Sequence, residues 1–375
     1  MCKRYYFRYK NDILATVKLV SNSIFSIEQL FVQPSAILYM LKDSNSFNKW
    51  VSDRQGIFRP FAGDIFKLGD IRSDVDFVDV SLCLSLKDCF WLCSDINLKW
   101  EDVNLFSHSF SEAYTKIASG LEGFRGTVIK TPSPEFSVLG SSCKFFKRQY
   151  DGIYLYKSFG GLAELEYSGV YSEYFVSQLL QFLDLDYVSY DIVKYDSRLF
   201  SKCKLFTSEY VNMIDIEDLV SDSIHLDEHI KHYSGVALKQ FCDMLVVDAL
   251  VFNVDRHCEN IAMLFDNSLK IFRLAPIFDF DHSLFYDLSL INRSRDYISD
   301  GIRKYVPKTW ANHTFIEQAK YCCYPELYFK LQKIKGNFEF TNHPKFPLNP
   351  ERLNMINNVF RWNYKRIMGV LDNDF

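Results

Sequence analysis

The sequence predicts an α+β protein that contains more than one domain. Two segments with candidate strands come first, and a mainly helical segment follows from about Asp215 to the C-terminus. The chain has 375 residues, which is enough for two or three domains at roughly 100–200 residues each. Hydrophobic residues make up 48% of it and aromatic residues 17%, so we expect a sizeable core in which most of the rings are buried.

The first 125 residues are predicted to form an accessory α+β domain. Tyr5–Tyr9 and Ile13–Leu19 flank the polar triplet Lys10-Asn11-Asp12, a pattern typical of a β-hairpin. Glycines cluster in Gly120–Gly126, and two prolines follow in Thr131–Pro134. Because Gly and Pro interrupt regular structure, we place a domain boundary there.

Residues 126–211 are predicted to be rich in strands and to contain one helix. Lys144–Arg148 and Ile153–Ser158 surround the turn sequence Tyr150-Asp151-Gly152, which indicates a second hairpin. Apolar side chains recur at the helical period in Ser172–Leu183. Two further strands are expected, at Val188–Lys194 and Lys204–Tyr210.

Residues 212–375 are predicted to form a third, mainly helical domain. Ala237–Phe252 is apolar almost all round, which is typical of a helix buried in the centre of a domain. Asn349 followed by Pro350 predicts the N-cap and first turn of a long C-terminal amphipathic helix.

Charge and composition disfavour several classes of protein. The formal net charge is −4, from 43 Lys and Arg against 47 Asp and Glu, which argues against direct binding of nucleic acid. No apolar run reaches the about 20 residues that a membrane-spanning helix needs, and the first residues lack the apolar core of a signal peptide. The 10 cysteines have none of the short paired spacings of a structural zinc site. We therefore expect reduced thiols and a cytoplasmic location.

The stretch from Asp255 to Asp279 contains the residues best suited to catalysis. Phosphoryl transfer requires a carboxylate that orients the acceptor hydroxyl and takes its proton, and oxygen ligands that hold Mg²⁺ against the phosphates. Asp255 and Asn260, on a loop that leaves the buried helix, have the spacing for both tasks. Ile261–Phe265 and Leu269–Leu274 predict a short hairpin whose exit places Asp279 as a second metal ligand. Asp and Asn are also common in turns and caps, but their joint spacing favours the catalytic interpretation.

Together these segments resemble the catalytic and metal-binding segments of HipA-family kinases. The matching residues are Asp255-Arg-His-Cys-Glu-Asn260 and Ala275-Pro-Ile-Phe-Asp279. The first also resembles the Asp-Arg-His-x-x-Asn form of phosphoinositide 3/4-kinases, and Asp279-Phe-Asp-His282 resembles their Asp-Phe-Gly-His, with Asp281 in place of the glycine. The resemblance covers about residues 136 to 285. It implies a two-lobed protein-kinase-like fold, with a small β-rich lobe that contains one helix, a larger and mainly helical lobe, and the extra N-terminal domain.

The same resemblance implies which residues bind ATP. Ser137-Val-Leu-Gly-Ser-Ser-Cys-Lys144 resembles the loop that precedes the strand over the phosphates. Its central residues are Gly140, Ser141 and Ser142. Lys157 has the place of the lysine that contacts the α- and β-phosphates, and Glu173 on the next helix is its expected partner. The hinge that meets the adenine ring would contain Phe206, Thr207, Glu209 and Tyr210.

Each of these residues also has an ordinary structural interpretation. A lysine such as Lys157 is usually solvated, and an isolated Glu173 would be an exposed helix residue; the downstream motif favours the functional roles. His257 could orient Asp255, act on the acceptor hydroxyl or support the loop, and we favour orientation or support. Asp248, which lies before the loop, is expected to anchor it.

The resemblance to HipA kinases implies an ATP- and Mg²⁺-dependent kinase that phosphorylates Ser or Thr of a protein. It also implies autophosphorylation at Ser137 and an inhibitory, antitoxin-like protein partner, as in a toxin–antitoxin pair. Phosphate at Ser137 would add about −1.5 to −2 charges beside the ATP site and repel the nucleotide.

Two other functions stay open. One is a lipid or small-molecule kinase; phosphoinositide kinases usually need a basic activation segment. In this sequence the corresponding segment contains aspartates as well as basic residues. The basic residues are Arg293, Arg295, Arg303, Lys304 and Lys308. The other is a nucleotide-binding pseudokinase, which the complete set of Lys157, Asp255, Asn260 and Asp279 disfavours.

Overall fold

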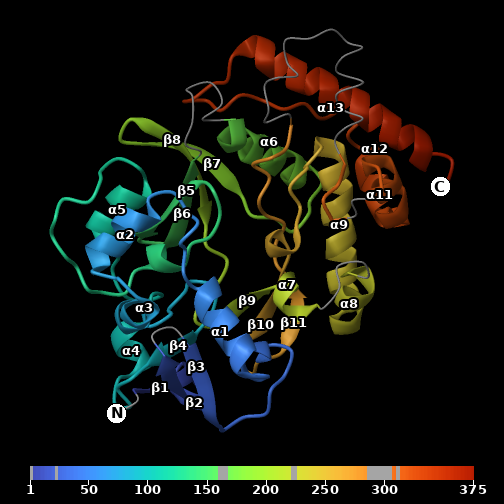
Figure 1. Ribbon diagram of the computed structural model, residues 1–375. Helices are drawn as coiled ribbons and strands as arrows, with labels where there is room; N and C mark the ends of the chain where they lie inside the picture. The colour runs from blue at the N-terminus through green and yellow to red at the C-terminus, as the bar shows by residue number, and fades with distance from the viewer. Residues whose placement is uncertain (1–2, 22–23, 159–167, 221–225, 285–305, 310–312) are drawn as a thin grey trace. The chain divides into compact units, whose positions relative to one another are not determined.

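The computed structural model describes residues 3–21, 24–158, 168–220, 226–284, 306–309 and 313–375 (Figure 1). The chain separates into two compact units. The first comprises Met1–Lys157, Lys204–Ile214 and Phe265–Lys270. The second comprises Ser158–Cys203, Asp215–Leu264 and Ile271–Phe375. The division into three domains at residues 125/126 and 211/212 stays a prediction.

The first unit contains a four-stranded antiparallel sheet in the order β3-β2-β1-β4. Its strands are β1 (Arg4–Tyr9), β2 (Asp12–Ser21), β3 (Ile24–Leu30) and β4 (Phe90–Cys93). The predicted N-terminal hairpin is confirmed, because β1 and β2 pair from Arg4↔Lys18 to Tyr9↔Asp12. Most side chains of β1 are buried, and Phe7 contacts Phe47 and Trp50 with ring centroids 5.4 and 4.9 Å away.

Short helices and a second hairpin complete the first unit. The helices are η1 (Tyr39–Leu41), α1 (Ser44–Asp53), α2 (Ala62–Gly69), α3 (Asp74–Ser81), α4 (Trp100–Val103), α5 (Glu112–Ala118) and η2 (Pro134–Ser137). The hairpin of β5 (Cys143–Gln149) and β6 (Gly152–Ser158) is the one predicted from Tyr150-Asp151-Gly152. Phe136 packs against Tyr114 and Phe77, with centroids 5.0 and 6.3 Å away, so η2 is fixed against α5 and α3.

The later elements follow in chain order. They are α6 (Ser168–Phe182), β7 (Tyr190–Tyr195), β8 (Arg198–Lys204), β9 (Val211–Asp215), α7 (Ile216–Leu219), α8 (Leu226–Tyr233), α9 (Gly235–Val251), η3 (Cys258–Asn260), β10 (Ala262–Asp266), β11 (Ile271–Leu274), α11 (Phe315–Cys322), α12 (Pro325–Gln332) and α13 (Pro350–Leu371). No helix in the described part of the chain is both long and apolar enough to cross a membrane.

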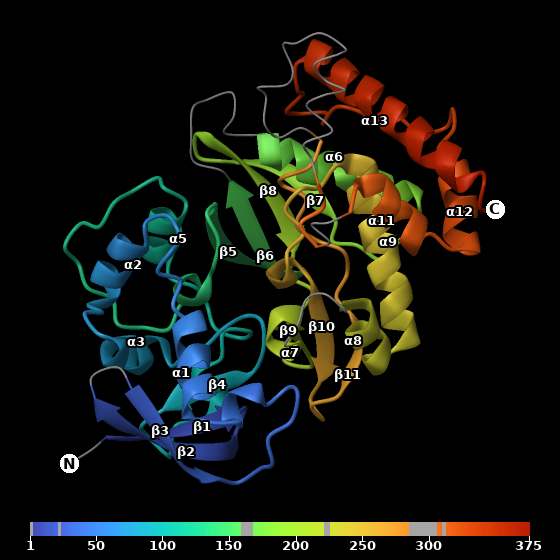
Figure 2. The same ribbon diagram turned by 45° about the vertical axis from the view of Figure 1, so that its right-hand side comes forward.

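Helix α9 is the centre of the second unit. It contacts α8, α11 and α13, and Figure 2 shows it beside α11. All its side chains from Met244 to Val251 are buried, as its largely apolar sequence predicts, and Asp248 is the one charged residue among these eight. Ser234 caps its N-terminus by accepting hydrogen bonds from the amides of Val236 and Ala237. The predicted cap of α13 is also confirmed, because Asn349 accepts from two amides of the first turn.

One expected strand is wrong. Lys204–Tyr210 was predicted as a strand, but β8 ends at Lys204 and the next strand begins at Val211. The backbone amides between them are used elsewhere: Leu205 donates to the carbonyl of Ile153 at 2.8 Å, and Ser208 donates to that of Val211 at 2.8 Å. The hydroxyl of Ser208 also accepts from the amides of Tyr210 at 3.2 Å and Val211 at 3.1 Å and so closes a turn. The predicted hinge residues therefore lie on an irregular segment.

Candidate active site

The loop that contains Asp255 is fixed where it leaves α9. Phe252 ends the helix in the left-handed conformation, with φ 54°. The side-chain amide of Asn253 then donates to Asp248 Oδ1 at 2.8 Å, and its backbone amide donates to the carbonyl of Asp248 at 2.9 Å. Asn253 Oδ1 accepts from the amide of Asp255 at 3.2 Å. The direction of the loop therefore depends on the last turns of α9.

Arg256 joins the two halves of the motif from inside the protein. Its side chain is 1% exposed, and it forms an ion pair with Asp248, which is also 1% exposed, with Nε 2.9 Å from Oδ2. Its Nη1 donates to the carbonyls of Asn260 at 2.9 Å and Phe278 at 2.6 Å. Burial alone would lower the pKa of Arg256, but the charge and hydrogen bonds of Asp248 outweigh it and raise this pKa above its ordinary value. Asp248 is thus the anchor that the sequence predicted.

The segment that contains Asp279 runs beside the same loop. Leu284 donates its amide to the carbonyl of Val251 at 2.8 Å, and Val254 donates to that of His282 at 3.4 Å. Asp279 has a φ of 62°, a region that Asp tolerates better than most residues. Its amide donates to the hydroxyl of Tyr190 at 3.3 Å.

Carboxylate oxygens converge around Asp281. Glu173, Asp279 and Asp281 each offer an oxygen, and the three atoms lie within 4.8 Å of one another. Asp255, Asp281 and His282 form a second such group. Oxygen donors of this kind are the ligands that Mg²⁺ prefers, so the residues present fit a magnesium site.

Asn260 is oriented by the loop itself. Its Nδ2 donates to the backbone carbonyl of Asp255 at 3.1 Å. Since this bond uses the nitrogen, the amide oxygen is the atom with which Asn260 would bind a metal. The structure thus brings Asp255, Asn260 and Asp279 into one unit through the hydrogen bonds of Arg256.

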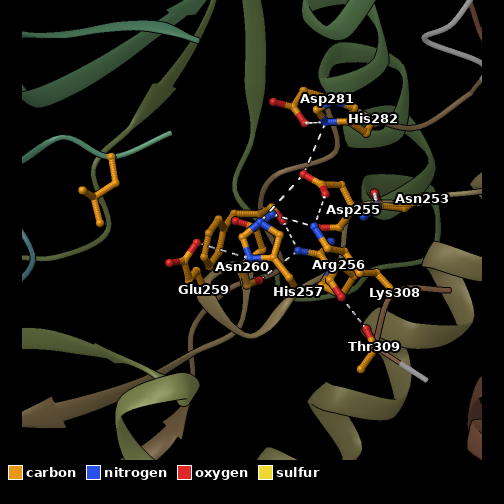
Figure 3. Close-up of polar contacts among 12 residues, drawn as sticks. Asn253, Asp255, Arg256, His257, Glu259, Asn260, Asp281, His282, Lys308 and Thr309 are labelled. Carbon is orange, nitrogen blue, oxygen red and sulfur yellow. Dashed lines mark hydrogen bonds and ion pairs between the residues drawn. The ribbon is translucent and has the colours of Figure 1, made fainter. Parts of the chain in front are cut away.

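The carboxylate of Asp255 is surrounded by basic groups (Figure 3). Lys308 Nζ lies 2.9 Å from its Oδ1. His282 Nδ1 lies 3.5 Å and His257 Nε2 lies 3.8 Å from its Oδ2. His257 also faces Glu259 at 3.5 Å. Asp255 is 30% exposed, so a group that arrives from the solvent can reach it.

The predicted phosphate loop lies in the first unit. Gly140 has a φ of 94°, which only glycine adopts readily, and Lys144 Nζ donates to the carbonyl of Leu139 at 3.1 Å. Ser141 is exposed and Ser142 is buried. Ser137 closes η2, where its hydroxyl donates to the carbonyl of Pro134 at 3.4 Å.

The other predicted nucleotide residues are distributed over both units. Lys157 is buried near the end of β6 in the first unit, and Glu173 is buried in α6 in the second, where it accepts from the hydroxyl of Ser201. The ion pair between them stays a prediction. In the hinge, Thr207 donates its hydroxyl to the carbonyl of Leu86 at 2.5 Å. Phe206 and Glu209 are half-buried, and Tyr210 is exposed.

Four residues of the site had no role assigned from the sequence: Arg256, Asp281, His282 and Lys308. The first three lie inside or next to the motifs, so their position was a usable signal. Lys308 was counted only as part of the basic segment. Of that segment, Arg293, Arg295, Arg303 and Lys304 lie outside the described residues.

Comparison with known proteins gives one relative in sequence. No protein-family model matches the chain. The serine/threonine-protein kinase CtkA of Helicobacter pylori strain J99 is 28% identical over 133 residues, which are 31% of this chain. The matched segment spans 41% of the length of CtkA.

One solved structure has a similar fold over almost the whole chain. HipA of Shewanella oneidensis MR-1, from a toxin–antitoxin system and solved with HipB and operator DNA, aligns over 98% of both chains with a TM-score of 0.55 and 10% identity. The crystal structure of the H. pylori proinflammatory kinase CtkA aligns over 60% of this chain and 94% of its own, with a TM-score of 0.44 and 18% identity. The resemblance to HipA-like kinases and the predicted α+β kinase-like fold are therefore confirmed.

Proposed function

We propose that this chain, which has the fold of HipA, is an ATP- and Mg²⁺-dependent protein kinase that phosphorylates Ser or Thr. The observation that carries the proposal is the junction made by Arg256, which ties the segment of Asp255 and Asn260 to the segment of Asp279. The sequence similarity to CtkA, which is described as a serine/threonine-protein kinase, supports the same reaction.

Each residue has a defined task in this reaction. Asp255 orients the acceptor hydroxyl and takes its proton. Asn260 and Asp279 would hold Mg²⁺ through their oxygen atoms, and the metal would neutralise charge on the phosphates. Gly140 lets the backbone amides of its loop approach the phosphates, and Lys157 contacts the α- and β-phosphates. His257 supports or orients Asp255.

The test uses γ-labelled ATP and Mg²⁺ with a general protein acceptor, followed by mapping of the phosphorylated residues. Asp255→Asn should lower the rate about 10²–10⁴-fold. Asp279→Asn should be similarly severe, and it is preferable to alanine because Asn also tolerates the left-handed backbone at this position. The control is Asp374→Asn, which lies in the ion pair of Lys320 outside the site.

The result also decides the class of acceptor. Label on Ser or Thr that is lost in Asp255→Asn supports a protein kinase. Label that appears only in phosphatidylinositol vesicles would assign a lipid kinase instead. Binding of ATP with no transfer to any acceptor would indicate a pseudokinase, and wild-type activity in Asp279→Asn would refute the site.

We further propose that the kinase phosphorylates its own Ser137. The hydroxyl of Ser137 is half-buried in η2, so this turn must open before the residue can accept phosphate. Mass spectrometry after incubation with Mg-ATP should find phosphate at Ser137 in the wild type and none in Asp255→Asn. An active enzyme with unmodified Ser137 would refute the proposal, and Ser141 and Ser142 are the neighbouring candidates.

An antitoxin-like inhibitory partner is proposed by analogy with HipA of S. oneidensis, which was solved with HipB. Expression of the active kinase in a bacterial host should then slow growth, and Asp255→Asn should not. Normal growth with a fully active wild type would contradict a toxin role. We also propose a cytoplasmic location, because the 10 cysteines are scattered through the sequence and reduced thiols are the rule in that compartment.

A further inference from the structure

Lys308 is held against the carboxylate of Asp255 by a segment far away in the sequence. Lys308 Nζ lies 2.9 Å from Asp255 Oδ1, although the two residues are 53 positions apart. The next residue, Thr309, donates its hydroxyl to the backbone carbonyl of Arg256 at 2.6 Å, and the preceding Pro307 is buried. The backbone is therefore fixed on both sides of Lys308, while the side chain stays 54% exposed (Figure 3).

The loop of Asp255 does not itself supply a cation for the transferred phosphoryl group. Arg256 is the one Arg or Lys between Asp255 and Asn260. Its guanidinium is buried, and its nitrogens already donate to Asp248 and to the carbonyls of Asn260 and Phe278. Moving it would leave the charge of Asp248 buried and unpaired, which is costly.

Phosphoryl transfer places strong demands on the charge near the base. Negative charge spreads over the equatorial oxygens of the transferred group in the transition state, and fixed cations aimed at that charge account for much of the rate. The acceptor hydroxyl lies within about 2.6–3.2 Å of the base, and the phosphorus lies about 3–3.5 Å beyond it. An ammonium group next to Asp255 is therefore within reach of the phosphoryl oxygens when its flexible four-carbon stem turns.

We propose that Lys308 is a catalytic residue that binds the transferred phosphoryl group; this rests on the proposed kinase function. The acceptor oxygen forms a bond to the γ-phosphorus, the bond from that phosphorus to the bridging β-oxygen breaks, and ADP leaves with the bond electrons. The acceptor proton passes to Asp255. Lys308 keeps its three protons, forms no covalent bond and leaves Asp255 Oδ1 to contact the phosphoryl oxygens.

A purely structural role explains the pair less well. An ion pair in which the lysine is half exposed contributes little to folding, and Thr309 and Pro307 already fix the segment. The contact could also act as a brake that competes with the acceptor for Asp255. The two roles predict opposite effects of removing the lysine, so one experiment separates them.

The experiment compares Lys308→Ala and Lys308→Arg with the wild type in turnover of Mg-ATP. The control is Lys320→Ala, because Lys320 is also 54% exposed and also pairs with an aspartate, Asp374, at 3.2 Å. Lys308→Ala should lower kcat about 10²–10³-fold and change the KM for ATP by about twofold or less. Lys308→Arg should recover part of the rate because it keeps the charge, and Lys320→Ala should match the wild type.

A binding measurement makes the result independent of the acceptor. Mg-ADP with aluminium fluoride imitates the transferred phosphoryl group. The wild type should bind this complex more tightly than Mg-ADP alone, and Lys308→Ala should lose most of that difference while it binds Mg-ADP normally. An unchanged difference, or a faster Lys308→Ala enzyme, would overturn the proposal. A wild type that binds no nucleotide at all would refute the kinase function itself, and the Lys308 proposal with it.

Discussion

Arg256 and Asp248 form a two-point ion pair in which both side chains are almost completely buried. Arg256 Nε lies 2.9 Å from Asp248 Oδ2, and Nη2 lies 3.1 Å from Oδ1. The same arginine reaches the carbonyls of Asn260 and Phe278. One guanidinium thus connects the helix, the loop of the proposed base and the segment of the proposed metal ligand.

The first prediction is that Asp248→Asn destabilises the second unit by about 3–5 kcal/mol, because it leaves the buried charge of Arg256 without a counter-charge. The midpoint of urea unfolding measures this loss. Glu326→Gln is the control: its pair with Lys239 is exposed on both sides, at 70% and 59%, and its removal should change the midpoint little. Equal midpoints for Asp248→Asn and the wild type would show that the ion pair does not hold the loop.

The second prediction concerns the backbone of the phosphate loop. Gly140 has a φ of 94°, and a Cβ at this position would lie 2.8 Å from Lys144 Nζ. Gly140→Ala should therefore displace the Lys144 side chain from the carbonyl of Leu139 and strain the backbone of the loop. We expect it to weaken the binding of Mg-ATP about tenfold, which corresponds to about 1.4 kcal/mol. Titration with a fluorescent ATP analogue measures the affinity.

Gly126→Ala is the matched control for the loop. Gly126 also has a positive φ, 85°, but a Cβ there would meet no atom within 4 Å. This variant should have similar backbone strain, about 1–2 kcal/mol, and unchanged affinity for Mg-ATP. Equal affinities in both variants would remove Gly140 from the nucleotide site.

The sequence predicted the elements whose signals are local. Helix α9 is apolar over most of its length, and Asn349 with Pro350 specifies the start of α13. The strand expected at Lys204–Tyr210 is wrong because a turn forms at Ser208. Its apolar and aromatic residues have the composition of a strand, but the hydroxyl of Ser208 accepts from the amides of Tyr210 and Val211 and interrupts the extended backbone. Strand propensity does not take account of such a side-chain bond.

In the candidate site, too, the sequence predicted the residues whose signals are local. Asp255, Asn260 and Asp279 follow from spacing within a short stretch, and the structure places their segments together. The contact between Lys308 and Asp255 spans 53 positions and has no characteristic spacing, so only the structure reveals it. For Asp281 the only signal was its place inside the motif, because the resemblance puts a glycine there. In the structure the glycine is not required, since the residue in the left-handed region is Asp279.

The third prediction is that Asp281 positions His282. Asp281 Oδ1 lies 2.7 Å from His282 Nδ1, and such a bond fixes the tautomer and orientation of the ring that faces Asp255. Asp281→Ala should lower kcat/KM about tenfold. Asp281→Asn should retain most of the rate, because its side-chain oxygen still accepts the hydrogen bond. If the Asp281→Asn enzyme is as slow as the Asp281→Ala enzyme and requires a higher concentration of Mg²⁺, the carboxylate of Asp281 binds the metal instead.

The last prediction concerns the pH dependence of stability and Glu135, which is buried in η2 of the first unit. Burial raises the pKa of Glu135, and the hydroxyl of Ser133, the charge of Arg59 and the amide of Phe146 only partly offset it. A carboxyl group whose folded pKa is raised stabilises the fold below its unfolded pKa of about 4.3, and this contribution is lost as the pH rises through the folded pKa.

Glu135→Gln does not titrate, and its amide can still accept from Phe146 and donate to Ser133. Between pH 4 and 8, the urea midpoint of Glu135→Gln relative to that of the wild type should therefore rise with pH. The difference should become constant once the Glu135 carboxyl is ionised in the folded protein. Ser133→Ala, with Glu135 unchanged, should enlarge the loss of stability that accompanies rising pH. It removes a hydrogen-bond donor that lowers the pKa of Glu135. Parallel pH profiles for Glu135→Gln and the wild type would mean that the Glu135 carboxyl titrates as it does in water.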